Sequence, residues 1–432
     1  MKTGLAVTAI LLALGPGSHT TFAQPLLRAA APFLTFSSSP RGNGMGGVEA
    51  TLPSSDAAAT IANPGQLGLF GLSNVFSAAT YAPKTELWPS VFSAPVEMTH
   101  TMTVSAINAG VNFKDLVSLP FSAGLSVGYS RTFVDFGEIT FTSSAGPTPI
   151  GSASLNDTYE NFSVGLGVEY VARLGVGMNF KRITSRMPGI SPSGQLGEYT
   201  ATPSATDFGI LLVLPVQGMV KEISGSSLSI AKGMDPFLDV SMCYVKSNVG
   251  GEVKYIDGMQ GDPLPRTALV GIGVEGGITA RAGESDWKMI TFSIARQAED
   301  ILVIPHNDGT FDYKGGLGDL SIGENVFTGR ATGFVTVRKG WQAGVAEVVY
   351  VRGGSVVGDG EDYATTGYSL CLGGLVRLLE FAVPQVAENS WLSFIGDHID
   401  LQYHSASYSG HESPWDATTF KGVNLVIHGL PW

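Results

Sequence analysis

The sequence predicts a transmembrane antiparallel β-barrel of about 14 strands, and three observations lead to this fold class. Only 14% of the 432 residues are charged, whereas about 25% is usual in a soluble domain. Glycine is frequent, with 56 residues, and the mean hydropathy of +0.19 is mildly apolar. Apolar residues also alternate with glycine and serine along many short segments, a pattern typical of strands that face lipid on one side.

The first 23 residues predict a signal peptide for export. Lys2 supplies a positive start, residues 5–14 are apolar, and Thr21-Phe22-Ala23 provides small residues before a cleavage site. We therefore expect the mature chain to begin at Gln24. The apolar stretch is shorter than the roughly 20 residues that a spanning helix requires, and no later apolar run reaches that length. Export without a spanning helix indicates the outer membrane of a Gram-negative-type bacterium.

Alternation with a period of two residues is clearest in three segments, residues 121–130, 162–170 and 174–181. A soluble sandwich usually presents charged side chains on its outer face, but the second face here carries mainly glycine and serine. Small inward-facing residues leave space for a plug or a ligand inside the barrel. We place the strand starts near residues 74, 99, 120, 158, 172, 205, 235, 265, 285, 328, 341, 365, 395 and 418. An even number is the rule for bacterial barrels.

Between these strands we expect long extracellular connections at residues 136–157, 184–204, 247–263 and 297–327, which are rich in glycine, aspartate, serine and proline. Residues 375–393 are different and predict a short helix. Aromatic residues should mark both membrane interfaces, and Trp432 resembles the terminal aromatic signal of barrels inserted by the outer-membrane assembly machinery. The remaining tryptophans fall near predicted strand ends: Trp88, Trp287, Trp341, Trp391 and Trp415.

A glycine-rich segment, residues 24–73, lies between the signal peptide and the first strand. It contains Arg41-Gly42-Asn43-Gly44-Met45-Gly46-Gly47, then Asp56-Ala57-Ala58, then Asn63-Pro64-Gly65. Its glycines permit positive φ and close backbone approach, and the last motif is a strong turn former. A periplasmic arm with ordinary glycine turns is the alternative to a chain folded inside the barrel. The glycine spacing and the lack of a following helix argue against a nucleotide-binding loop.

This segment resembles the N-terminal region of the FadL superfamily of outer-membrane barrels. There, an R-x-x-G-M-G-G stretch precedes an Asp-Ala element and an Asn-Pro-Ala-Gly-like turn. The Phe33-Leu34 element and the Ser-x-x-Arg element ending at Arg41 resemble the PorV/PorQ branch more closely than the fatty-acid transporters. The resemblance implies that residues 24–73 form a luminal plug or hatch and that residues 74–432 form the barrel.

The two branches imply different functions and partners. A PorV-like barrel is a partner or shuttle in type IX protein secretion, where it pairs with a giant translocon barrel and receives exported cargo protein. A FadL-like barrel is a passive transporter of hydrophobic small molecules such as fatty acids and hydrocarbons. Both are surrounded by outer-membrane lipid. The net charge of −12 argues against a nucleic-acid partner, because phosphate binding needs clustered lysine and arginine.

One row of polar residues resembles a catalytic constellation. His398, Asp400, Gln402 and His404 share a face of the thirteenth predicted strand. A hydrolase would require a serine within reach of a histidine, together with a third group that orients the imidazole. Ser405 lies on the opposite face, so we predict a lumen-facing polar row, no catalytic residue and no cofactor.

The remaining candidate sites are acidic loops and two cysteines. Clustered acidic oxygens could hold calcium, but their spacing does not match an EF-hand, and we predict a solvated acidic rim without metal. Cys243 and Cys371 fall on non-neighbouring predicted strands and read as two isolated small residues. The acidic residues concerned are Asp308, Asp312, Asp319, Asp359, Glu361 and Asp362.

Overall fold

The computed structural model describes most of the chain after residue 28. The described ranges are 29–80, 85–87, 100–117, 119–142, 149–190, 196–225, 229–231, 233–256, 261–282, 285–306, 308–359, 361–383, 390–410 and 418–429. The predicted signal peptide and the predictions for Trp88, Trp415 and Trp432 lie outside these residues.

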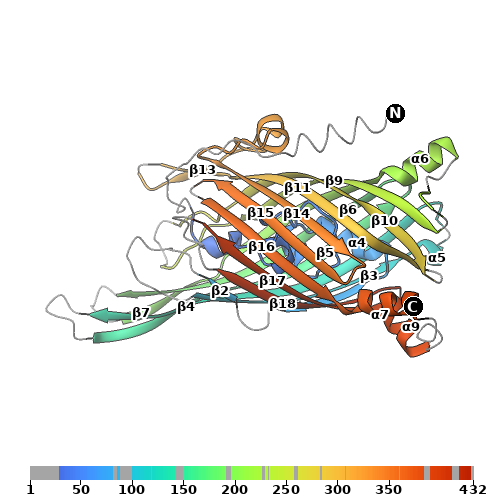
Figure 1. The fold of residues 1–432 in the computed structure, drawn as a ribbon. Helices are drawn as coiled ribbons and strands as arrows, with labels where there is room; N and C mark the ends of the chain where they lie inside the picture. Colours follow the sequence, from blue (N-terminus) through green and yellow to red (C-terminus); the bar gives the residue numbers. More distant parts are fainter. Residues whose placement is uncertain are drawn as a thin grey trace.

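One antiparallel sheet forms the body of the molecule and closes on itself (Figure 1). Closure is made by β1, which pairs with both β18 and β3, so that Phe76 lies opposite Ile427. The strands are β1 Phe76–Thr80, β2 Thr85–Leu87, β3 His100–Asn112, β4 Ser122–Thr142, β5 Pro149–Glu169, β6 Arg173–Ile190, β7 Leu196–Ala201, β8 Ser204–Pro215, β9 Met234–Gly250, β10 Thr267–Ala282, β11 Ser285–Ile301, β14 Val335–Val345, β15 Val349–Gly358, β16 Glu361–Cys371, β17 Ile399–Ser409 and β18 Thr419–Ile427.

The ring contains 14 strand positions, which confirms the predicted fold class. β1 and β2 both pair with β3 and β18, and therefore share one position. β7 and β8 both pair with β6 and share another. Each remaining strand pairs with its neighbours in chain order, as in an up-and-down barrel.

The outer wall of the barrel is apolar, whereas the inner wall combines small and polar residues with apolar side chains that pack inside the lumen. Along β5, Phe162 and Leu166 are each 60% exposed, whereas the intervening Ser163 is 5% exposed. The same alternation gives the barrel a lipid-facing surface of large side chains. Its members include Ile107, Leu125, Val127, Val164, Val168, Met178, Phe180, Ile290, Phe292, Trp341, Val345, Val351, Tyr368, Leu370 and Leu401.

The two ends of the barrel differ. At the end that we call the turn end, residues 170–172 and 346–348 join strands tightly, β1 begins and β18 finishes. This end also carries the helices α5 Lys114–Val117, α6 Val216–Ser224, α7 Leu372–Ala382 and α9 Ser390–His398, and the last two confirm the helix expected within residues 375–393. The opposite loop end carries the hairpin of β12 Val303–Pro305 and β13 Phe311–Tyr313 and the π-helix η2 Ile322–Phe327 (Figure 1).

Within the described part of the chain, no helix is long and apolar enough to cross a membrane.

Three of the four expected long connections proved largely structured. β4 and β5 are 21 residues long each, and they continue into residues 136–157, which were expected to be a loop. β6 and β7 likewise occupy much of residues 184–204, and residues 297–327 contain the end of β11 together with β12, β13 and η2. A strand needs only about 9–11 residues to cross the membrane. The parts of these strands beyond the membrane have polar sequences that resemble loops. Their backbones nevertheless continue to pair, because the hydrogen bonds of the ladder do not depend on the side chains.

The predicted starts of the tenth and eleventh strands, near residues 328 and 341, were also wrong. The two strands, β14 and β15, begin later, at Val335 and Val349. The turn between them uses Ala346 and Glu347 at φ of 55° and 52°. Left-handed backbone is usually signalled by glycine or asparagine, and neither is present at this turn. Trp341 therefore lies within β14.

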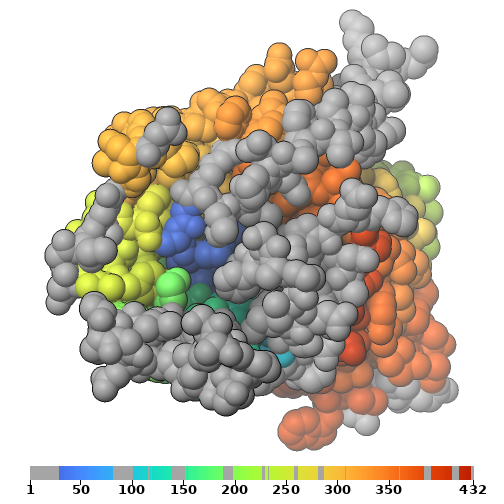
Figure 2. Space-filling model, turned by 90° about the vertical axis from the view of Figure 1, so that its left-hand side faces the viewer, coloured from blue at the N-terminus to red at the C-terminus, as the bar shows by residue number. Residues whose placement is uncertain are grey.

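Residues 29–75, which we call the luminal segment, lie inside the ring of strands. Figure 2 views the loop end, where the segment is visible in blue inside the opening. It contains four short helices: η1 Pro32–Thr35, α2 Pro40–Asn43, α3 Ala59–Ala62 and α4 Gly65–Leu72. α4 contacts β3, β4, β5 and β6, while α2 contacts β16, β17 and β18 on the other side. The segment therefore touches walls on opposite sides of the lumen.

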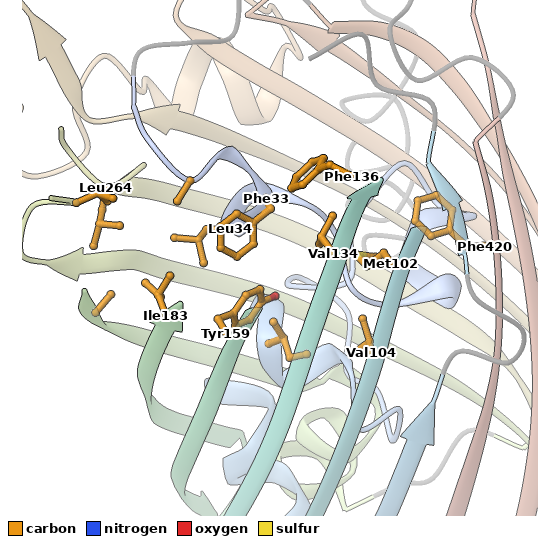
Figure 3. Packing of buried hydrophobic residues seen from close by; sticks show 14 of the residues in the cluster. Phe33, Leu34, Met102, Val104, Val134, Phe136, Tyr159, Ile183, Leu264 and Phe420 are labelled. Atoms are coloured by element: carbon orange, nitrogen blue, oxygen red, sulfur yellow. The ribbon is translucent and has the colours of Figure 1, made fainter. Parts of the chain in front are cut away.

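Apolar side chains fill the loop-end half of the lumen around the start of this segment. Phe33 is fully buried, and its ring centroid lies 5.9 Å from that of Tyr159 on β5 (Figure 3). We call this group the loop-end cluster, and inward-facing residues of many strands contribute to it. Its members include Phe33, Leu34, Met102, Val104, Val134, Phe136, Tyr159, Ile183, Leu264, Tyr363, Tyr408 and Phe420.

Candidate functional site

The lumen is the candidate functional site, and glycine packing determines how the luminal segment is held there. α4 lies so close to the wall that a Cβ atom on Gly68 would be 2.3 Å from the Leu166 carbonyl oxygen and 2.8 Å from Gly175 Cα. Gly71 meets Gly124 of β4 in the same way. Glycine on both surfaces therefore allows backbone to contact backbone, which larger side chains would prevent.

The Arg41–Gly47 motif contacts the wall formed by β11 and β14 to β17. Gly46, at φ 69°, donates its N–H to Thr365 Oγ1 at 2.8 Å, and Gly47 at φ 75° accepts a 2.7 Å bond from Gln297 Nε2. Asn43 Oδ1 accepts a 2.7 Å hydrogen bond from the Tyr408 hydroxyl. The two glycines hold a tight backbone turn whose polar groups are satisfied by the barrel wall.

The other motif residues pack at close range. Gly44 faces Gly367 and Ala406, where an added Cβ would lie 3.1 Å from Gly367 Cα. Met45 is buried, and Gly42 lies directly against the Glu49 side chain. Arg41 differs from its neighbours because its side chain lines a cavity, described below.

Asp56 and Asn63 organise the second half of the segment. Asp56 accepts hydrogen bonds from Ser39 Oγ at 2.6 Å and from the Ala58 N–H at 2.9 Å. Asn63 Oδ1 accepts the Gly65 N–H at 2.8 Å, so that Asn63-Pro64-Gly65 turns the chain directly into α4. An added Cβ on Gly65 would lie 2.8 Å from the Leu211 nitrogen on β8. Both motifs thus fix the segment to itself and to the wall.

Glu49 is a buried carboxyl at the centre of the luminal segment. Burial raises the pKa of Glu49, and the hydrogen bond from the Ser37 hydroxyl and the positive charge of Arg338 oppose that rise. Arg338 itself lies 3.1 Å from Glu299. The protonated form of Glu49 is therefore favoured more strongly than in an exposed carboxyl.

A cavity of about 390 Å³, the turn-end chamber, lies between the luminal segment and the wall at the turn end. Most of its charges form pairs: Arg173–Asp239 at 2.6 Å, Lys288–Glu275 at 2.5 Å and Arg377–Glu347 at 2.9 Å. Its lining is otherwise largely polar. The chamber is lined by Arg41, Leu52, Pro53, Ser54, Ser55, Leu69, Phe70, Ser73, Val75, Arg173, Asp239, Ser241, Glu275, Lys288, Thr291, Gln342, Glu347, Tyr350, Arg352, Cys371, Gly373, Gly374, Arg377, Asp400, Gln402, His404 and His428.

The polar row expected on the thirteenth strand lies at this chamber, with one exception. Asp400, Gln402 and His404 line the chamber from β17. Gln402 donates a 2.5 Å bond to Asp400, which also accepts the Gly373 N–H at 2.9 Å. His398 ends helix α9, before the strand begins, and its Nδ1 lies 2.9 Å from the carbonyl oxygen of His428.

A second polar arrangement at the chamber joins His404 to three residues that carry no sequence signal. Arg352 on β15 donates to Gln342 on β14 at 2.7 Å and to the Ser369 hydroxyl on β16, and Ser369 contacts His404 Nδ1. These four residues come from four consecutive strands of the ring. Isolated polar residues on separate strands become one network only after the strand register is known.

The acidic loop residues mostly have local partners. Asp312 lies 3.0 Å from His306, Asp319 lies 2.6 Å from Lys314, and Asp308 accepts bonds from Thr310. No group of three histidine, cysteine or acidic side chains arranged to hold a metal occurs among the residues that the structure describes. Cys243 and Cys371 are both free and buried.

No protein-family model and no curated protein sequence matches the chain. Among solved structures, the toluene transporter TbuX of Ralstonia pickettii is similar over 91% of this chain and 97% of its own, at 12% identity and a TM-score of 0.38. The P. putida toluene transporter TodX is similar over 90% of this chain and 96% of its own, at 10% identity and a TM-score of 0.36. The β domain of the Bordetella autotransporter BrkA is similar over 83% of this chain and 100% of its own, at 8% identity and a TM-score of 0.36. Likeness at this level extends to barrels of unlike function and assigns none to this chain.

The closed ring of 14 strands and its apolar outer wall suffice for a structural assignment. The fold is that of a bacterial outer-membrane barrel. The turn end corresponds to the periplasmic side of such barrels, because their strands are joined by short turns there and by longer loops outside.

Proposed function

We propose that this chain is a non-enzymatic outer-membrane barrel of PorV type that serves as a partner or shuttle for cargo proteins in type IX secretion. One observation carries the proposal: the luminal segment fills the middle of the barrel and is anchored to opposite walls by buried contacts. A filled lumen favours recognition at the outer surfaces over passage through the centre. The motif resemblance of residues 24–73 to the PorV/PorQ branch supports the same role, with this segment as a plug.

The two larger cavities that border the segment also support this proposal. The turn-end chamber is lined by charged and polar side chains, and a second cavity of about 70 Å³ is bordered by Lys181, Glu299 and Arg338 among others. A transport path for hydrocarbons needs a continuous apolar lining, because each charged group along it would have to be desolvated. Neither cavity provides such a lining.

An apolar surface for a protein partner is available at the loop end. Ile322, Phe327 and Phe334 are 45%, 48% and 53% exposed, and Ile304 on β12 is 39% exposed. All four belong to the connection between β11 and β14, outside the ring of strands. Exposed apolar side chains on this connection would supply contact area to a protein partner.

The test is affinity purification from native outer membranes in a mild detergent, with mass spectrometry of both proteins and lipids. We expect the wild-type chain to recover a much larger barrel or exported cargo, and Phe327→Asp to lose it. Ile223→Asp is the matched control, because Ile223 is 85% exposed on α6 at the other end. Recovery of the chain alone, with a defined fatty acid or hydrocarbon bound, would overturn the proposal.

A passive transporter of hydrophobic small molecules is the second candidate, and the loop-end cluster favours it. Phe33 lies among inward-facing apolar side chains and would block an apolar path through the loop-end half of the lumen. If the chain were such a transporter, Phe33→Ala would change the rate at which a fluorescent fatty acid enters vesicles containing the barrel. An unchanged rate, equal to that of empty vesicles, would exclude this candidate.

A further inference from the structure

We propose that the turn-end chamber binds the oxyanion group of a small polar molecule, a carboxylate or a phosphate, at a cluster formed by Arg41, Arg352 and His404. We call this group the oxyanion cluster. The inference goes beyond the proposed function and does not depend on it, because it concerns a soluble ligand inside the barrel and not a protein partner outside.

The charges of the chamber do not balance locally. Three of its cations are each within 3 Å of a carboxylate, as described above. Arg41 and Arg352 have no carboxylate within ion-pair distance among the described residues, and the charges of these two arginines repel each other. Asp400 accepts hydrogen bonds from neutral donors, Gln402 and the Gly373 N–H, so it keeps its negative charge in the same chamber. Five lysine and arginine side chains and four carboxyl groups line the chamber, which leaves an excess of one positive charge there.

Two hydrogen bonds hold the Arg352 guanidinium in a fixed orientation at the chamber. Its side chain is buried, with 5% of the residue exposed, and its Nε donates to Gln342 Oε1 while one terminal nitrogen donates to Ser369. Both partners are neutral, so they orient the guanidinium without cancelling its charge. A planar guanidinium with remaining N–H donors is well suited to bind a carboxylate or phosphate.

His404 contributes a donor that points away from its own network. Because Arg352 donates to the Ser369 oxygen, the Ser369 hydroxyl proton is available to His404 Nδ1, and the neutral ring then carries its proton on Nε2. His404 is 2% exposed, and its Nε2 has no hydrogen-bond partner in the described part of the chain. Buried donors are normally satisfied, and an acceptor atom on a ligand would supply the partner that this N–H lacks.

Arg41 brings the third donor from the luminal segment. Its guanidinium lines the chamber and makes one long contact, 3.4 Å to the Pro53 carbonyl oxygen. Arg41 can therefore reorient toward a ligand at little cost, whereas Arg352 and His404 are preset by the barrel wall. The volume of about 390 Å³ exceeds that of a lone ion and suits a small metabolite whose remainder is polar, because the other walls carry hydroxyl, amide and paired ionic groups.

The experiment titrates the purified full-length barrel, in a non-ionic detergent, with inorganic phosphate and with succinate by calorimetry. We expect saturable binding of at least one probe, and the two arms distinguish phosphate from carboxylate recognition. Arg41→Gln and Arg352→Gln should each weaken binding by between roughly tenfold and a hundredfold, the loss of one charge-assisted hydrogen bond. Arg186→Gln removes the same charge from an exposed ion pair outside the chamber and should leave binding within roughly twofold.

The fold of each variant is checked by its heat-dependent gel mobility, and Arg41→Gln keeps the test valid if Arg352→Gln does not fold. Binding that is equally strong in wild type and Arg41→Gln would overturn the proposal. So would the absence of saturable binding of both probes to the wild-type barrel. Neither result affects the secretion role, which is measured by partner recovery.

Discussion

The Tyr408 hydroxyl on β17 donates a 2.7 Å hydrogen bond to Oδ1 of Asn43, a residue 365 positions earlier in the chain. Both side chains are buried, and the Tyr408 ring also stacks on Tyr363 at 4.7 Å between centroids. This bond joins the glycine-rich motif of the luminal segment to a strand near the C-terminus. The position of the motif is therefore set by the far end of the sequence.

Tyr408→Phe should loosen this attachment without leaving a cavity. Asn43 Oδ1 would lose its buried partner, which typically costs about 1–3 kcal/mol of the free energy of unfolding. We expect faster amide hydrogen exchange at residues 40–47 together with a lower urea midpoint. Tyr368→Phe is the control, because Tyr368 is 45% exposed on the outer wall. Equal exchange rates in both variants would show that the bond does not anchor the motif.

Gly68→Ala should disrupt the contact between α4 and the wall. The new methyl would lie 2.3 Å from the Leu166 carbonyl oxygen, and backbone on both sides has to shift to accept it. Overpacking of this kind costs about 1–3 kcal/mol, which urea unfolding measures. Gly218→Ala on the exposed helix α6 meets nothing closer than 3.7 Å and should stabilise by about 0.5–1 kcal/mol. A neutral Gly68→Ala would mean that α4 moves freely within the lumen.

The ion pair of Lys181 and Asp207 is buried in the lumen, at 2.8 Å and with side chains 3% and 0% exposed. Lys181→Met should cost about 3–5 kcal/mol, because Asp207 is left as an unpaired buried charge. The double variant Lys181→Met/Asp207→Asn should recover part of this loss. In the exposed pair at 3.4 Å, Arg186→Met should cost less than about 1 kcal/mol. Losses of the same size at the two sites would contradict the burial argument.

Stability should depend on pH through Glu49, whose pKa burial raises above its ordinary value of 4.5. The folded chain then keeps a proton that the unfolded chain releases, so this contribution is complete below about pH 4.5 and is lost as the pH rises through the raised pKa. Glu49→Gln does not titrate and should gain stability relative to wild type between about pH 4.5 and about pH 8. Urea unfolding at both values gives the difference, with the exposed Glu198→Gln as control. A pH-independent difference between Glu49→Gln and wild type would contradict this account.

The fold could be predicted from local pattern because lipid and lumen impose opposite demands on alternate residues. Phe162 and Ser163 illustrate this, since one is exposed on the outer wall and the other is buried inside. The turn at Ala346 and Glu347 could not be predicted, because its left-handed conformation is imposed by the strands that it joins. The link from Gln342 through Arg352 and Ser369 to His404 depends on the register of four strands, which single-sequence patterns do not specify.

Closure of the ring by β1 and β18 has a consequence for how the molecule assembles. The luminal segment precedes β1 in the chain, yet it bonds to β5 on one side and to β16 and β17 on the other. Its full set of contacts exists only when the last strands are in place. The barrel therefore closes around its own N-terminal region. Cleavage of the chain between residues 75 and 76 in the folded molecule would leave a peptide enclosed by the wall.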